Sequence, residues 1–245
     1  MSNLTKLNQL LKNQPVKADS IEAVQLLDYA DNISRIENVT AVVSDLRRGT
    51  SRIFPGKFGI VLGVIDYSEE DSIWEKTILN LMSEEEREEK YLAELRFFNF
   101  LRHVPRYARP DYYLVSKLRM KTATGDSIDV IHRMYYIYAD DSETVTHALC
   151  LYGCKAFDFA GKSIVVNSLT GVSEELTSSA DASILSRREK QVLALIDSGK
   201  RSYEIAEILS ISKNTVSRHR QEILAKLQVK NSMEACRIAK TMKII

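Results

Sequence analysis

Residues 185–245 read LSRREKQVLALIDSGKRSYEIAEILSISKNTVSRHRQEILAKLQVKNSMEACRIAKTMKII, and this stretch decides the fold of the C-terminal part of the chain. Four short helical patterns follow one another in it. The first begins at Ser186, which forms a Ser-x-x-Glu capping box with Glu189, and ends at Gly199, a residue type that tolerates positive φ. Residues 210–212 form a turn between the second and third patterns.

Two short helices joined by a tight turn are typical of the helix-turn-helix. Ser202 is expected to cap the second helix and Ser212 the third, while Asn231 with Glu234 opens the fourth. The apolar face of the second helix is predicted to consist of Ile205, Ile208 and Leu209.

The outer side of the third helix carries the chemistry of interest. Spacings of three and four residues place Asn214, Ser217, Arg218, Gln221 and Ala225 in one stripe. Amide and guanidinium groups suit base edges in the major groove, and a small residue allows close approach. The flanking cations Lys213, Arg220, Lys226 and Lys230 are predicted to reach phosphates, and the candidate DNA-binding set is completed by Lys200, Arg201, Ser202 and Thr215.

This segment resembles the DNA-binding domain of LuxR/FixJ/NarL-type (GerE-type) transcriptional regulators. The resemblance covers about a quarter of the chain and rests on matches that include Leu185, Ser186, Arg188, Glu189, Val192, Leu193, Gly199, Glu204, Ile205, Ala206, Ser212, Thr215, Val216, His219, Ile223, Lys226, Leu227 and Val229. It implies an all-α four-helix domain that binds double-stranded DNA. Ser217 departs from the family pattern, where a basic residue is common, and Glu222 stands where Asn is common, so the base preference cannot be carried over.

Several residues of this segment have structural interpretations. His219 is interpreted as a packing residue, and Arg188 with Glu189 as structural groups inside the small bundle. The main alternative for the domain is promoter recognition of the sigma-factor type, which is still DNA binding.

Charge is distributed unevenly along the 245 residues. From Ser186 onward there are 13 basic and 6 acidic residues, a net charge of +7, which leaves −6 for the rest of a chain whose total is +1. A basic tail on an acidic body is typical of a nucleic-acid-binding module joined to another domain.

The cysteines and the hydropathy of the chain argue against metal-binding, disulfide-rich, secreted and membrane proteins. Cys150, Cys154 and Cys236 are odd in number and have no metal-like spacing, so no metal site or disulfide framework is expected. The first two are predicted to be buried thiols on one side of a strand, with a redox role as the alternative. No cofactor is expected, because no flavin-type cysteine motif and no haem ligand is found. No signal peptide and no apolar run near 18 residues is present, which predicts a cytoplasmic protein without membrane contact.

The N-terminal part reads as an α+β domain. Residues 1–37 are predicted to be helical and to pack on the chain's own sheet or on a second copy. Two short strand patterns follow Val39, then short helical patches, a long helix after Ser83, and three antiparallel strands between residues 112 and 154.

This order resembles a PAS domain, a five-stranded sheet with helices over one face, across Val39 to Asp158. The predicted domain limits are 1–37 for the N-terminal helices, 38–167 for the PAS-like sensory or dimerisation domain, 168–184 for a Ser/Thr-rich linker and 185–245 for the DNA-binding domain. The resemblance implies a domain that senses a small molecule or a partner, or that dimerises, and the contact residues stay open. A homodimer is expected because a single helix-turn-helix makes few contacts with DNA. His103, His132 and His147 are interpreted as structural or exposed.

Two other classes fit less well. An enzyme is not expected, because no phosphate-binding glycine loop, nucleophile elbow or clustered metal-ligand set is found; a small α+β enzyme carried to DNA by the tail is the alternative. A phosphorylated receiver domain would need alternating β/α units, and acyl-homoserine-lactone receptors use several tryptophans where this chain has Trp74 alone. The signal, the operator and the direction of regulation stay open.

Overall fold

The computed structural model describes residues 22–139, 144–176, 185–227, 229, 231–242 and 244–245. Contacts between Cα atoms divide the chain into two compact units, Met1–Leu176 (the front domain) and Thr177–Ile245 (the tail domain). Among the described residues, no helix combines the length and the apolarity needed to cross a lipid bilayer.

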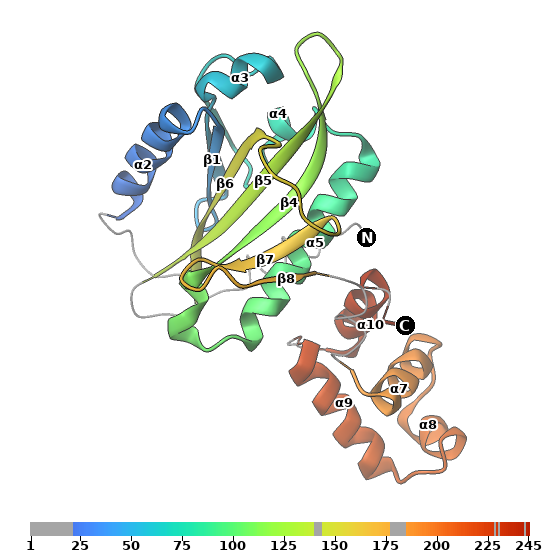
Figure 1. The fold of residues 1–245 in the computed structure, drawn as a ribbon. Helices are drawn as coiled ribbons and strands as arrows, with labels where there is room; N and C mark the ends of the chain where they lie inside the picture. The colour runs from blue at the N-terminus through green and yellow to red at the C-terminus, as the bar shows by residue number, and fades with distance from the viewer. Residues whose placement is uncertain (1–21, 140–143, 177–184, 228, 230, 243) are drawn as a thin grey trace. The chain divides into compact units, whose positions relative to one another are not determined.

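The front domain is built on one antiparallel sheet with strand order β3-β2-β1-β6-β5-β4-β7-β8. Figure 1 labels the part of this sheet from β1 to β8. Its strands are β1 (Thr40–Asp45), β2 (Thr50–Phe54), β3 (Ser68–Glu70), β4 (Tyr112–Lys121), β5 (Ser127–Tyr138), β6 (Val145–Cys154), β7 (Ser163–Asn167) and β8 (Ser173–Glu175). The predicted α+β class and the meander of three long strands, β4-β5-β6, are confirmed.

Helices cover both faces of this sheet. Helix α2 (Glu22–Ile36) packs through Ala30 against a cluster that contains Ala41 and Val43 of β1 and Leu149 of β6, so this predicted helix packs on its own chain. The other face meets α5 (Glu84–His103), where Phe97 stacks on Tyr136 at 5.5 Å between ring centroids. The short helices are α3 (Gly56–Leu62), α4 (Lys76–Leu79) and the 3-10 helix η1 (Arg106–Asp111).

Local sequence explains where α5 begins. The Ser83 hydroxyl accepts a hydrogen bond from the backbone N–H of Glu86, and the first turn is acidic, as suits the positive end of a helix dipole. The buried face of this helix contains Tyr91, Leu95 and Phe98. Residues 1–21 of the predicted N-terminal helices lie outside the described residues.

Three predictions about the front domain need correction. The sheet has eight strands instead of five, because β3, β7 and β8 extend its two edges. Strand β8 lies inside the range predicted as linker and pairs with β7, so residues 168–176 belong to the front domain; residues 177–184 are not described. Cys150 is buried but Cys154 is exposed, since it is the last residue of β6.

The tail domain consists of α7 (Arg187–Asp197), α8 (Ser202–Ile208), α9 (Lys213–Leu227) and α10 (Ser232–Thr241). Four helices were predicted here and four are found among the described residues. The capping box is present: the Ser186 hydroxyl accepts from the Glu189 N–H, and the Glu189 carboxylate accepts from the Ser186 N–H. Gly199 follows α7 with φ of 79°, the left-handed conformation that favours glycine.

Candidate DNA-binding surface

The turn between α8 and α9 fixes how the two helices meet. Ser210 has φ of 50°, and the Ile211 N–H donates to the carbonyl of Ala206 at 2.9 Å, which reverses the chain tightly. The Ser212 hydroxyl then accepts from the Thr215 N–H at 3.0 Å and caps α9, as predicted. The hydroxyls of Ser212 and Thr215 also lie 2.9 Å apart, so Thr215 is part of this cap.

Helix α9 has one buried and one exposed side. Val216, Ile223 and Leu227 are buried among apolar residues of the tail domain. The opposite side is exposed and carries the predicted stripe and its first flanking cation, namely Lys213, Asn214, Ser217, Arg218, Gln221 and Ala225. The fold therefore presents two amides, a hydroxyl and a guanidinium on one helical face, the chemistry that base edges require.

Arg218 forms an ion pair on the exposed side of α9. Its side chain is 78% exposed, and its Nε lies 2.8 Å from Oε1 of Glu222, one helical turn further on. The hydrogen bond from Arg218 lowers the pKa of the Glu222 carboxyl. The spacing of four residues was the signal that could have identified this pair. The pair uses the Nε of Arg218.

Two predicted phosphate contacts are already engaged inside the domain. Arg220 donates to the hydroxyls of Ser202 and Ser232, each at 3.0 Å, and thereby joins α8, α9 and α10. Lys226 lies 2.8 Å from both carboxylate oxygens of the buried Glu189 on α7. These two cations link helices of the tail domain, and their predicted contacts with phosphates stay predictions.

The beginning of α8 supplies further charge near the same helices. Lys200 and Arg201 precede the helix, and Arg201 is exposed while its backbone N–H donates to the Glu204 carboxylate at 2.7 Å. Ser202 is the first residue of α8, so its predicted role as cap is wrong: its hydroxyl accepts from Arg220 instead. Lys230 lies outside the described residues.

The remaining side-chain predictions for this domain have mixed outcomes. Ile208 is 53% exposed, so the predicted apolar face of α8 is wrong at this residue, while Ile205 is fully buried. Arg188 donates to the carbonyl of Leu209 and so has the structural role that was predicted.

A protein-family model matches the residues of the tail domain. Residues 183–239 match the model described as bacterial regulatory proteins, luxR family. The tail domain is a LuxR-family helix-turn-helix domain. This LuxR-type domain carries α7 to α9 and most of α10, so every described residue of the candidate surface lies inside the match.

Curated relatives match the same part of the chain. The transcriptional regulatory protein DesR of Bacillus subtilis is 48% identical over 56 residues, which are 23% of this chain and 28% of DesR. The transcriptional activator protein EsaR of Pantoea stewartii is 40% identical over 70 residues, 29% of this chain and 28% of EsaR. The chain thus matches little more than a quarter of the length of these relatives.

Among solved structures, this chain is similar to a Vibrio cholera VqmA-ligand-DNA complex. The superposition covers 91% of this chain and 89% of the VqmA chain, with 12% sequence identity and a TM-score of 0.31. A superposition this loose says nothing about the ligand or partner of the present chain.

Proposed function

We propose that the chain is a sequence-specific, DNA-binding transcriptional regulator that inserts α9 into the major groove. The observation that carries the proposal is the exposed stripe of Asn214, Ser217, Arg218 and Gln221 on a helix whose opposite face is buried in a LuxR-type domain. We assign these four residues to base edges, because amides and guanidinium groups can make paired hydrogen bonds there.

The remaining candidates have two different roles in this proposal. Lys200, Arg201 and Lys213 contact phosphates, since all three are cations at the exposed starts of α8 and α9. Arg220 and Lys226 position the recognition helix through Ser202, Ser232 and Glu189, and act on DNA only through it.

We further propose that the front domain forms a homodimer and does not catalyse a reaction. A single helix-turn-helix makes few contacts, and two copies held together would place two recognition helices on adjacent half-sites. Such a regulator acts in the cytoplasm, where bacterial DNA lies. A ligand of the front domain would regulate binding only through a difference in affinity between two states.

The test compares single variants of the full-length chain on a selected operator. Asn214→Ala and Gln221→Ala are each expected to weaken specific binding by about 1–3 kcal/mol and to relax the preference at one position. Lys213→Ala should weaken binding to all sequences alike and reduce the salt dependence by about one released counterion.

Lys240→Ala is the matched control for charge, because it removes one cation of the same domain from α10, where Lys240 pairs with Asp197 at 2.6 Å. If Asn214→Ala and Gln221→Ala both bound with wild-type affinity and specificity, the proposal that α9 enters the major groove would be wrong.

A further inference from the structure

The core of the front domain contains a cluster of charged side chains. Lys90 and Glu94 of α5 and Glu75, just before α4, are each 2% exposed. The Lys90 ammonium lies 2.6 Å from the Glu94 carboxylate and 3.4 Å from that of Glu75, which also accepts from the Tyr152 hydroxyl at 2.6 Å. Two acids and one base give this buried group one excess negative charge when both carboxylates are ionised.

Two further metal-ligand side chains adjoin this group. His132 on β5 is fully buried, and neither of its ring nitrogens has a hydrogen-bond partner. Its ring stacks on Tyr152 at 4.8 Å between centroids. Burial, and secondly the charge of Lys90, hold the pKa of His132 well below its ordinary value, so the imidazole is neutral and keeps a lone pair. Cys150 on β6 is buried beside it.

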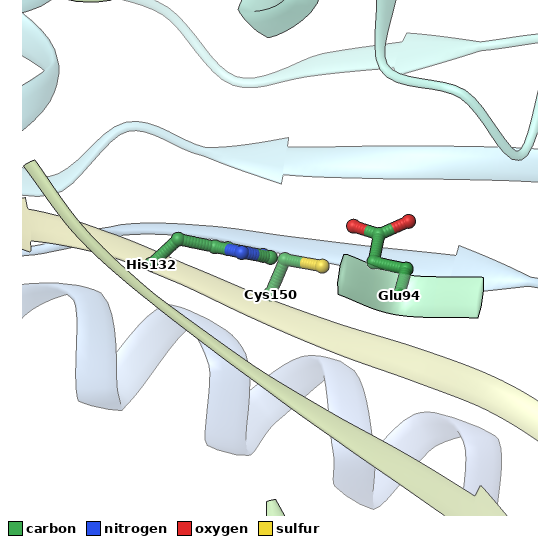
Figure 2. A group of neighbouring side chains, drawn as sticks. All are labelled: Glu94, His132 and Cys150. Carbon is green, nitrogen blue, oxygen red and sulfur yellow. The ribbon is translucent and has the colours of Figure 1, made fainter. Parts of the chain in front are cut away.

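We propose that Glu94, His132 and Cys150 bind a divalent transition-metal ion of the zinc type. One donor atom from each residue lies within 4.8 Å of the others (Figure 2), and the three come from α5, β5 and β6. In Figure 2 the imidazole and the thiol extend toward the carboxylate. Sulfur, nitrogen and oxygen donors together suit Zn²⁺, which takes three protein ligands in open sites.

The geometry requires only small movements. Metal–ligand distances of about 2.0–2.3 Å place tetrahedral donors about 3.3–3.8 Å apart, so contraction by about 1 Å through side-chain rotation would close the site. A cavity of about 20 Å³ is lined by residues that include Glu94 and Cys150. A space of this size can hold about one water molecule, and its lining contains two of the three proposed ligands, Glu94 and Cys150, but not His132.

Charge balance favours a dication at this place. Binding releases the Cys150 proton to solvent and leaves a thiolate. Two positive charges of the metal, with the thiolate and the one excess negative charge of Glu75, Lys90 and Glu94, then sum to zero. Without the ion, burial raises the pKa of the Cys150 thiol well above its ordinary value.

A second group of possible ligands in the described residues is less suitable. Glu189, His219 and Glu222 also have donor atoms within 4.8 Å of one another. Both oxygens of Glu189 already accept from Lys226, whereas Lys90 contacts the Glu94 carboxylate through Oε1. This group contains no sulfur, so a metal bound there would give no thiolate absorption.

The test uses the full-length chain freed of metal by a chelator and titrated with Co²⁺ as an optical probe. One equivalent should produce a sulfur-to-cobalt charge-transfer band and the visible bands of a tetrahedral ion, and Zn²⁺ should displace it. The variant Cys154→Ser/Cys236→Ala leaves Cys150 as the one thiol of a chain with three cysteines, and it should keep the band at the same stoichiometry.

His132→Phe is the matched loss variant, because phenylalanine preserves the stacking on Tyr152 and removes two unpartnered nitrogens. It should fold and bind Co²⁺ at least about a hundredfold more weakly. Absence of the band in the Cys154→Ser/Cys236→Ala protein, or unchanged cobalt affinity in folded His132→Phe protein, would overturn the proposal. The inference is independent of DNA binding, because the site lies wholly in the front domain and its readouts need no DNA.

Discussion

At the scale of single residues, Glu189 joins two helices of the tail domain through one buried carboxylate. Burial alone would raise its pKa, but hydrogen bonds from Lys226 and Ser186 lower the pKa below the ordinary 4.5. A group with a depressed pKa in the folded state stabilises the fold above its unfolded pKa and loses that contribution as the pH falls through the folded value. The stability of the tail domain should therefore be level above about pH 4.5 and decline below it.

The pH dependence of tail-domain stability can be measured by hydrogen exchange of the α7 and α9 amides in the full-length chain at a series of pH values. The control is Glu189→Gln, which keeps the shape of the side chain and removes its titration, so its stability should depend less on pH in the acid range. An identical acid dependence in both proteins would assign the decline to other groups.

The cation of the same pair gives a second prediction. Lys226→Met leaves the Glu189 carboxylate buried without its cation and should destabilise the tail domain by about 1–3 kcal/mol. Lys240→Met removes an exposed ion pair with Asp197 and should cost less than about 1 kcal/mol. Urea dependence of amide exchange in α7 and α9 gives both values, and equal losses would contradict the different roles given to the two lysines.

Residue types could be predicted from the sequence better than residue partners. The exposed stripe of α9 follows from helical spacing alone and is found as expected. The bonds of Arg220 to Ser202 and Ser232 join three helices, and no spacing along the chain shows which helices meet. For the same reason Lys90 and Glu94, a pair typical of a solvated helix face, gave no sign of their burial under the sheet.

At the scale of elements, helix ends are set by single residues. Gly199 has φ of 79°, and a Cβ added there would meet nothing within 4 Å, so its effect is purely on the backbone. Gly199→Ala should therefore destabilise the tail domain by about 1–2 kcal/mol. Gly199→Asn should lose less, because asparagine tolerates this conformation. Chemical denaturation of the two variants, followed by α7 amide exchange, tests the order, and equal stability of alanine and glycine would contradict it.

The sequence predicts the long central strands of the sheet. It does not predict the short edge strands, which form by pairing with a neighbouring strand. Strands β4, β5 and β6 are long, and β5 is rich in β-branched and aromatic residues. Strands β3 and β8 both read Ser-Glu-Glu and have no such pattern. They are strands because β2 and β7 offer free backbone groups at the sheet edges, a cause that lies outside the segments themselves.

At the scale of the whole molecule, the chain joins an acidic front domain to a basic LuxR-type tail domain. The proposed division of labour is that the front domain pairs two copies and the tail domain reads DNA. Pairing raises the effective concentration of the second recognition helix, so the full-length chain should bind its operator 10²–10⁴-fold more tightly than residues 184–245 alone, an order-of-magnitude expectation for linked sites. Titration of both proteins on one operator measures this ratio, and a ratio near one would make the front domain a sensor without a role in pairing.

The central claim is that the exposed face of α9 reads base edges, and selection of bound DNA from a random pool tests it most directly. Full-length wild-type protein and Asn214→Ala/Gln221→Ala protein would be selected in parallel at fixed salt, with Lys240→Ala as the charge control. The wild type and the control should enrich one two-fold-symmetric sequence, and the double variant should retain salt-dependent non-specific binding without enriching it. Enrichment of the same sequence by the double variant would show that another surface of the chain recognises DNA.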